Sequence, residues 1–232
     1  MRLTNNIERK TSIINSWNNT YSKKAITLFP RNLKEIRIIF NKLKHEKKHF
    51  LIKTGDCSYD SKSINSDQKS ILISLKKFNR INKVNKNDGY INVDAGVMIC
   101  DLVKYLKLKN LTLYSVPGGD KISIGGAISA NVIGKDSSKS IACFGDAIRY
   151  LEILDEKGKV KIIKKNSKEL NKYIGAFGLS GLIVRAGIKV KKISSSNVKV
   201  NTKILNNLKE IQIELNHKAD YKYIQIDPFF RS

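Results

Sequence analysis

The sequence contains few of the residues that bind metals or form disulfides. Its 232 residues include only three cysteines and three histidines. Cys57, Cys100 and Cys143 are odd in number and show no C-x-x-C spacing, so neither a disulfide framework nor a zinc site is indicated. His45 and His49 lie four residues apart among lysines, which is more typical of a solvated helix face than of metal ligation. We therefore expect no metal ion.

Long hydrophobic runs are absent too. The N-terminus is polar and lacks the apolar core of a signal peptide. No stretch approaches the ~20 apolar residues that a membrane-spanning helix needs. These absences predict a cytoplasmic protein, and they leave open a peripheral association with the inner face of the membrane.

Acidic residues are scarce relative to basic ones. The chain has 44 Lys and Arg against 20 Asp and Glu, a formal net charge of +24. Such a balance often marks a nucleic-acid-binding protein. Here, however, lysines are spread along the whole chain, and aromatic residues are not interleaved with them as a base-stacking surface requires. We expect no nucleic-acid partner. Weak attraction to anionic lipid or to a phosphorylated lipid substrate fits better.

Glycine, by contrast, is concentrated in one stretch, residues 116–145. Pro-Gly-Gly, Gly-Gly-Ala and Asn-Val-Ile-Gly all fall between residues 117 and 134, and residues 123–132 carry no charge. Because glycine permits positive φ and close approach to a ligand, we expect both at Gly125 and Gly126. Consecutive amides in such turns form an anion-binding nest suited to a pyrophosphate. The spacing matches neither the Rossmann nor the Walker motif, and a purely structural glycine-rich turn is the alternative.

A second candidate segment, residues 50–59, lies upstream. Residues 50–52 are a short apolar run typical of a buried strand, and residues 53–58 form the loop that leaves it. Before it, residues 32–47 carry apolar side chains at helical spacing. A strand and loop after such a helix indicate a small β-α-β unit, in which strand ends offer a ligand site.

Taken together, these segments resemble the FAD-binding half of the vanillyl-alcohol-oxidase type flavoproteins, the PCMH-type FAD domain. Within that superfamily the likeness is to the decaprenylphosphoryl-ribose 2′-oxidases and the related sugar and lactone oxidases. It covers most of residues 16–193 and includes residues 27–30, 93–97 and 176–183. The resemblance implies an α+β fold: a small β-α-β subdomain and a mixed sheet flanked by helices, followed by the truncated start of a substrate domain.

The resemblance also implies which residues bind FAD, with non-covalent attachment. Residues 53–59 would embrace the pyrophosphate and the flavin edge, residues 117–133 the other side of the flavin and phosphates, and residues 178–183 the adenine end. The implied contacts are Lys53, Thr54, Gly55, Asp56, Cys57, Ser58, Tyr59, Gly118, Gly119, Ser123, Ile124, Gly125, Gly126, Ala130, Asn131, Val132, Ile133, Gly134, Gly181 and Ile183.

Three positions depart from the family pattern. Asp56 stands where relatives often have glycine, and a carboxylate beside a pyrophosphate is repelled unless it turns outward or meets a cation. Cys57 occupies the place of a histidine that bonds covalently to the flavin in some relatives, and we expect a small packed cysteine there. Ile133 replaces a histidine near the flavin in the ribose-oxidase relatives, and an isoleucine cannot donate a proton.

The chain divides into three parts by its pattern: a polar arm (residues 1–20), the FAD-binding domain (21–193) and the incomplete start of a substrate, or cap, domain (197–232). Asp155 to Gly158 reads as a hairpin turn with glycine at positive φ. We expect strands near 50–53, 71–75, 90–94, 148–154, 159–163, 181–192, 198–203 and 221–227, and helices near 32–46, 98–108 and 205–214.

The implied function is an FAD-dependent oxidation of a sugar alcohol, a lactone or a polyprenyl-phospho-sugar hydroxyl. In the relatives, the groups that orient the sugar and take its proton lie mostly in the substrate domain, so no catalytic residue is named. Tyr59, Asp120 and Lys135 are interpreted as cofactor or loop contacts. A split-gene product completed by a second polypeptide, a truncated product and an incomplete record remain open.

Two other functions remain as alternatives. One is a catalytically silent module that binds flavin or acts as a scaffold. The other is the aminosugar-nucleotide reductase of cell-wall synthesis, which shares the FAD fold, although residues 123–131 favour the oxidase branch.

Overall fold

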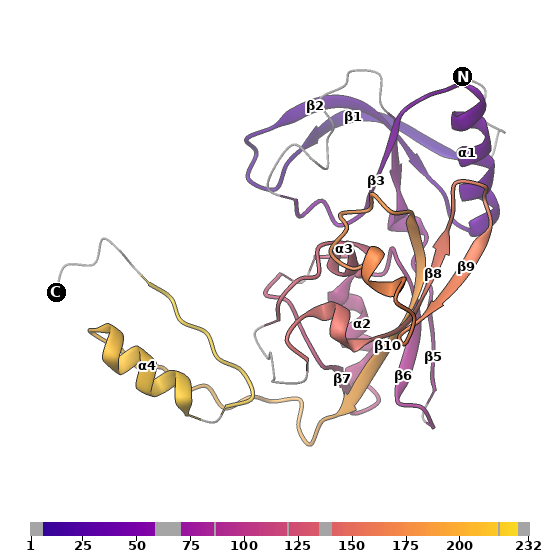
Figure 1. The fold of residues 1–232 in the computed structure, drawn as a ribbon. Coiled ribbons are helices and arrows are strands. Elements are labelled where there is room, and N and C mark those ends of the chain that lie inside the picture. Colours follow the sequence, from indigo (N-terminus) through magenta and orange to yellow (C-terminus); the bar gives the residue numbers. More distant parts are fainter. Residues whose placement is uncertain are drawn as a thin grey trace.

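The computed structural model describes residues 7–58, 71–85, 87–119, 121–134, 141–217 and 219–226. Two β-sheets with helices packed against them form the body, and a segment that carries a further helix extends away from it (Figure 1). The architecture is therefore α+β, as the sequence predicts.

The smaller sheet is built around a strand–helix–strand unit. Its helix, α1, begins after Asn32, whose side chain accepts a hydrogen bond from the Glu35 amide at 2.9 Å. β3 and β2 both run parallel to β4, while β1 pairs antiparallel with β2. The strand order is β1-β2-β4-β3, with β1 (Glu8–Asn15), β2 (Ser22–Phe29), α1 (Leu33–His45), β3 (Phe50–Lys53) and β4 (Ile71–Ser74).

Within the predicted N-terminal arm, residues 8–15 instead form β1. Its eight residues pair with β2 along their whole length, from Glu8 opposite Phe29 to Asn15 opposite Ser22. Most of its side chains are exposed, so β1 lacks the apolar alternation that identifies a half-buried strand. The strand is held by backbone pairing, which the sequence pattern does not reveal.

The larger sheet is organised by its longest strand, β10. This antiparallel strand pairs with β6 on one side and with β8 on the other, and its last residues also pair with β7. β8 and β9 form the predicted hairpin, with Gly158 at φ 74°. The order is β5-β6-β10-β8-β9, with β5 (Ile81–Asn85), β6 (Tyr90–Asp94), β7 (Leu111–Leu113), β8 (Ile148–Leu154), β9 (Val160–Lys164) and β10 (Leu182–Lys192).

Helices cover one face of this sheet and join it to the smaller one. α2 (Ile99–Lys107) and α3 (Ile124–Ser129) contribute fully buried side chains to its core (Figure 1). α1 belongs to both halves, since Ile36 packs into the larger core while Ile39 and Leu43 pack into the smaller. This shared packing fixes the two sheets relative to each other. Three short 3-10 turns complete the body: η2 (Leu75–Lys77), η3 (Phe144–Ala147) and η4 (Leu170–Lys172).

A buried ion-pair network crosses the larger sheet. Arg185 on β10 donates to Asp94 on β6 at 3.1 Å and to both carboxylate oxygens of Glu152 on β8 at 3.1 and 3.2 Å. The Asp94 side chain is only 1% exposed and also accepts the Arg80 amide at 3.0 Å. Although burial acts to lower it, the carboxylates of Glu152 and Asp94 hold the pKa of Arg185 above its ordinary value.

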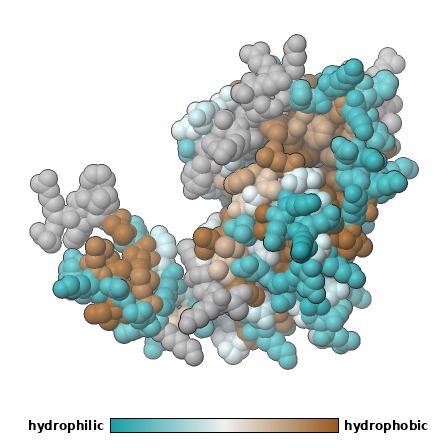
Figure 2. All heavy atoms as spheres, in the orientation of Figure 1, coloured by the Kyte–Doolittle hydropathy of each residue, from teal (hydrophilic) through white to brown (hydrophobic). Residues whose placement is uncertain are grey.

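The segment after β10 departs from the predicted pattern. The expected helix is present as α4 (Leu208–Asn216), but residues 198–203 and residues 221–226 form no strands. None of the α4 side chains is buried, and Figure 2 shows hydrophobic side chains at the surface of this segment. A strand needs a partner edge for its backbone groups, and the described residues offer none there.

Two further observations bear on function. No helix in the described part of the chain is long and apolar enough to cross a membrane. Among the described residues, no group of three or more His, Cys, Asp or Glu side chains is arranged to hold a metal ion.

Candidate functional site

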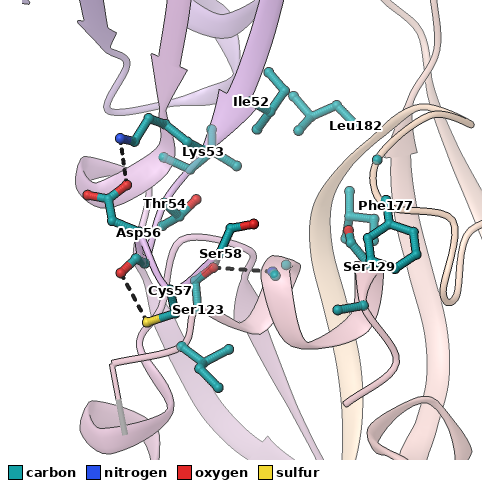
Figure 3. A pocket seen from close by; sticks show the side chains of 18 of the residues that line it. Ile52, Lys53, Thr54, Asp56, Cys57, Ser58, Ser123, Ser129, Phe177 and Leu182 are labelled. Carbon is teal, nitrogen blue, oxygen red and sulfur yellow. Dashed lines mark hydrogen bonds and ion pairs between the residues drawn. The ribbon is translucent and has the colours of Figure 1, made fainter. Parts of the chain in front are cut away.

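A cleft of about 360 Å³ lies where the two sheets meet (Figure 3). The loop that leaves β3 forms one wall, α3 forms another, and the turn before β10 forms a third. The sequence-predicted residues that line it are Lys53, Thr54, Gly55, Asp56, Cys57, Ser58, Ser123, Gly125, Gly126, Ala130, Val132, Gly181 and Ile183.

Other predicted contacts lie away from the cleft lining. Gly118 and Gly119 are exposed, Ile133 is 70% exposed, and Gly134 is buried in an isolated bridge to Pro117. Ile124 is fully buried in the larger core. The Asn131 side chain accepts the Gly145 amide at 3.0 Å, which gives it a structural role. Tyr59, Asp120 and Lys135 lie outside the described residues.

The loop of residues 53–58 carries a compact charge cluster. Asp56 meets the Lys53 ammonium at 2.7 Å and the Lys76 ammonium at 2.7 Å (Figure 3 draws the first). The Lys53 side chain is only 5% exposed, so its interaction with Asp56 is poorly screened by water. Asp56 thus meets two cations, and the three groups together carry one net positive charge beside the cleft.

The same loop also has backbone amides that are not used within the described part of the protein. Asp56 adopts the left-handed conformation with φ 58°. The amides of Gly55, Asp56 and Ser58 donate no hydrogen bond to any residue in the described ranges. Successive amides in such a turn form an anion-binding concavity. An anion in the cleft would find both amide donors and ammonium groups at this loop.

The glycine-rich stretch has a different role from the predicted one. Residues 124–129 form α3 with Ser123 as its cap, and neither Gly125 nor Gly126 has positive φ. The Ile124 and Gly125 amides donate to the Val97 and Ala95 carbonyls at 2.8 Å each, so they are already used within the protein. The predicted nest at Gly125 and Gly126 is therefore wrong, because this backbone is helical and packs against the residues after β6.

Glycine in this site serves close packing instead. A Cβ on Gly55 would lie 2.4 Å from the Lys121 carbonyl oxygen and 3.1 Å from the Ser123 nitrogen. A Cβ on Gly126 would lie 3.1 Å from the Ser123 hydroxyl, on the side of α3 that lines the cleft. A Cβ on Gly55 would therefore force the backbone to shift, whereas a Cβ on Gly126 would make a tight contact with a side-chain hydroxyl.

Cys57 is half-buried and belongs to no disulfide. Its thiol donates to the Gly55 carbonyl at 3.3 Å, which turns the sulfur toward its own loop (Figure 3). This contact fits the predicted packed cysteine.

Several lining residues were not among the individually predicted contacts, although Ile122, Ser129 and Leu182 fall within the predicted segments 117–133 and 178–183. Ser129 and Phe177 lie next to each other on the side of the cleft opposite Asp56 (Figure 3). Ile52 and Leu182 bring the ends of β3 and β10 together. Leu75 and Ile122 complete the apolar lining. Nothing in the local pattern separates these residues from ordinary core or loop positions, and only the meeting of two sheets makes them neighbours.

Replacing Lys53 with methionine is expected to weaken FAD binding roughly thirtyfold, about 2 kcal/mol, because a buried cation is lost and the Asp56 charge is less neutralised. Adding Asp56→Asn should restore most of the affinity, since the residual repulsion is removed. Isothermal titration of both variants with FAD checks this. Lys77→Met is the control, because Lys77 pairs with Glu8 instead. A double variant as weak as Lys53→Met would contradict the role given to Asp56.

Comparison with known proteins assigns the chain to a family. The family model described as an FAD binding domain matches residues 25–164. The chain belongs to this FAD-binding domain family. The predicted superfamily and the predicted cofactor, FAD, are thereby confirmed. The cation-bearing loop, its amide donors and the glycines that keep the cleft open fit a dinucleotide with a diphosphate.

Two curated relatives illustrate the match. The chain is 29% identical over 123 residues to decaprenylphosphoryl-β-D-ribose oxidase of Mycolicibacterium smegmatis, covering 52% of this chain and 26% of that protein. It is 31% identical over 163 residues to UDP-N-acetylenolpyruvoylglucosamine reductase of Francisella tularensis, covering 67% of this chain and 49% of that protein. The chain thus spans between a quarter and a half of the length of these relatives.

A solved structure shares the fold. Cholesterol oxidase from Brevibacterium sterolicum superposes with a TM-score of 0.73 over 82% of this chain and 39% of that protein, at 15% identity. The likeness supports the PCMH-type FAD-binding architecture of the two sheets.

Proposed function

We propose that this chain is the FAD-binding portion of an FAD-dependent oxidoreductase that oxidises the hydroxyl of a sugar alcohol, a lactone or a polyprenyl-phospho-sugar. The observation that carries the proposal is the loop of residues 53–58, which lines the cleft opposite α3 and in which Lys53 and Asp56 form an ion pair that Lys76 of η2 joins. When bound, FAD supplies the hydride acceptor for such an oxidation.

The chain's own residues then hold and orient the cofactor. Lys53 and Lys76 together outweigh the negative charge of Asp56 and attract the diphosphate, and the loop amides donate to it. The apolar side chains of Ile52, Ile122 and Leu182 exclude water from one side of the cleft. We name no catalytic base, because groups that shape a substrate pocket would come from a cap domain in the same or a second polypeptide.

The segment after β10 supports such a cap. Its apolar side chains are exposed, among them Val200 at 79%, Leu208 at 79% and Tyr223 at 69%. A surface of this kind gains free energy by packing against a partner. The lysine excess of the chain supports weak attraction to anionic headgroups, which suits a lipid-linked substrate.

Anaerobic reduction of bound flavin by candidate sugar alcohols tests the proposal. The chain is co-expressed with the cap half of a homologous oxidase, and flavin absorbance is followed after each substrate is added. We expect bleaching with at least one sugar alcohol or lactone, and none with this chain alone. Stable oxidised flavin with every substrate would favour a silent flavin-binding or scaffolding module.

A reductase is the second candidate, favoured by the longer match to the aminosugar-nucleotide reductase. Electrons would then leave the reduced flavin for the substrate, and an external reductant, for which NADPH serves as the probe, would have to supply them. Rapid bleaching by NADPH in the same cuvette, without any sugar alcohol, would support this reading over the oxidase.

Non-covalent attachment gives a further prediction. Because the Cys57 thiol is directed to the Gly55 carbonyl, we expect no bond between this sulfur and the flavin. Precipitation of the purified protein with acid should release all yellow colour into the supernatant. Flavin that stays with the pellet would contradict the prediction. If the Cys57→Ala variant then released its flavin, Cys57 would be the residue that carries the covalent bond.

A further inference from the structure

The larger sheet has a second face, on the side away from α2 and α3. Along β10, Ala186 and Ile188 are buried in the core to which these helices contribute, so Gly187 and Lys189 project to the opposite face. Lys189 lies seven positions along β10 from Leu182, which lines the cleft, a span of roughly 23 Å in an extended strand. This face is therefore remote from the FAD cleft.

A tyrosine lies across β10 on this face. Tyr150 of β8 is opposite Gly187, where a Cβ would lie 2.4 Å from its ring, so glycine is the residue that leaves space for the ring. The Tyr150 hydroxyl donates to the Asn92 side chain on β6. Its ring meets the Tyr90 ring edge-on, with centroids 6.2 Å apart. These contacts span three strands and fix a pair of tyrosines on the sheet.

An irregularity in β8 adds a cation to this pair. The register of β8 against β10 shifts between Tyr150 and Ile148, so Arg149 is an extra residue in its strand. Such a bulge redirects a side chain, and the Arg149 guanidinium lies over the Tyr90 ring, 5.7 Å from its centroid. Lys189 is directly opposite Tyr90 in the ladder between β10 and β6. Two cations thus flank one tyrosine.

Lys165, which follows β9, brings a third cation to the same place. Its amide donates to the Arg149 carbonyl at 2.8 Å, and its ammonium donates to the Asp146 carbonyl at 2.7 Å. Burial and the positive charges of Lys189 and Arg149 hold the pKa of Lys165 below its ordinary value, although the Asp146 carboxylate acts in the opposite direction. The three cations are therefore close enough to repel one another.

Within the described ranges, no carboxylate offsets this repulsion by forming an ion pair with any of the three cations. The carboxylates of Glu152 and Asp94, on the same face, are bound to Arg185. The Asp146 carboxylate accepts the amides of residues 142 and 143. Like charges that the fold holds together in this way are stabilised by an anion that contacts all of them.

We propose that Arg149, Lys165 and Lys189 form an anion site, separate from the cofactor cleft, that binds a phosphate monoester group. Such a group carries a charge of about −1.5 to −2 at pH 7 and presents three acceptor oxygens. It therefore matches three converging cations better than a carboxylate or a phosphodiester, each of which carries a single charge. A soluble phosphorylated metabolite and a lipid headgroup both offer this chemistry, and the experiment separates them.

Titration of the isotope-labelled, FAD-saturated chain with inorganic phosphate, followed by amide NMR, tests the proposal. FAD keeps the cleft occupied, and sodium chloride keeps the ionic strength constant. Lys189→Gln removes one cation of the site. Lys192→Gln is the matched control, because it removes the same charge from the same strand at a position opposite Leu111 on β7. Both variants should keep the wild-type melting temperature.

We expect saturable shifts at the amides of Tyr90, Arg149 and Lys189. The dissociation constant for phosphate should rise roughly fivefold in Lys189→Gln, as for an exposed charge pair, and stay unchanged in Lys192→Gln. Equal phosphate affinity in Lys189→Gln and the wild type would overturn the proposal.

Flotation with phosphatidylcholine vesicles identifies the source of the phosphate group. The vesicles contain either phosphatidic acid, a monoester, or phosphatidylserine at equal surface charge. A preference for phosphatidic acid that Lys189→Gln abolishes would support the site with a lipid headgroup as its ligand. Phosphate binding without that preference would support it with a soluble ligand. A chain that binds neither inorganic phosphate nor phosphatidic acid at this face would contradict the proposal, whatever its affinity for FAD.

Discussion

Replacing Gly55 with alanine is expected to reduce FAD affinity by roughly 100-fold, which corresponds to about 3 kcal/mol of overpacking. The added Cβ would lie 2.4 Å from the Lys121 carbonyl oxygen, a backbone atom that cannot rotate away. The loop of residues 53–58 must then move off the segment before α3, and its amides and Lys53 leave their places beside the diphosphate. Titration of the purified variant with FAD measures the loss.

Gly119→Ala provides the control for this experiment. Gly119 is exposed, lies outside the cleft lining, and a Cβ there would make only an ordinary contact of 3.4 Å with the Ile122 side chain. Circular dichroism should show that both variants are folded. Wild-type FAD affinity in Gly55→Ala would mean that the packing of this loop does not determine the cofactor site.

Replacing Arg185 with leucine is expected to lower the free energy of unfolding by about 3 kcal/mol. This is the lower limit of the usual cost of breaking a buried ion pair, because the Arg185 side chain is 33% exposed. Among the described residues, the Asp94 carboxylate, 1% exposed, would keep only the Arg80 amide as a partner. Urea unfolding measures the change. Adding Asp94→Asn should recover most of the loss, because a neutral amide removes the unpaired charge.

Lys192→Leu on the same strand is the matched control, since Lys192 is exposed at the end of β10. Its free energy of unfolding should stay within ~0.5 kcal/mol of the wild type, as is usual for surface substitutions. If Arg185→Leu behaved like this control, the network across β6, β10 and β8 would not be a source of stability.

The elements with strong patterns were predictable from the sequence. The apolar runs of β3 and β4 and the helical stripe of α1 appear where periodicity puts them, because each buries one regular set of side chains. β1 was missed since its side chains are mostly exposed, and residues 198–203 were wrongly expected to pair although no strand lies beside them in the described part of the chain. Pairing partners, unlike periodicity, are a property of the fold.

The site was predictable only in part, because local sequence patterns mark its segments but not the contacts between them. Clustered glycines and the loop after β3 drew attention to the two walls that do meet in the cleft. Their conformation was not predictable, because α3 forms through the Ser123 cap and through bonds of Ile124 and Gly125 to residues 95–97. Asp56 is unfavourable beside a diphosphate by its charge alone, and only the fold brings it against both Lys53 and Lys76, the latter twenty positions away.

Titration of the flavin-free chain with FAD, followed by quenching of Trp17 and by the flavin absorbance bands, tests the central claim most directly. The structure predicts saturable binding of one FAD for each chain, with affinity that falls as salt screens Lys76, whose side chain is 45% exposed. It also predicts protection of residues 53–58 from amide hydrogen exchange in the complex. A folded chain that neither quenches nor gains protection at this loop would contradict the assignment of the cleft as an FAD site.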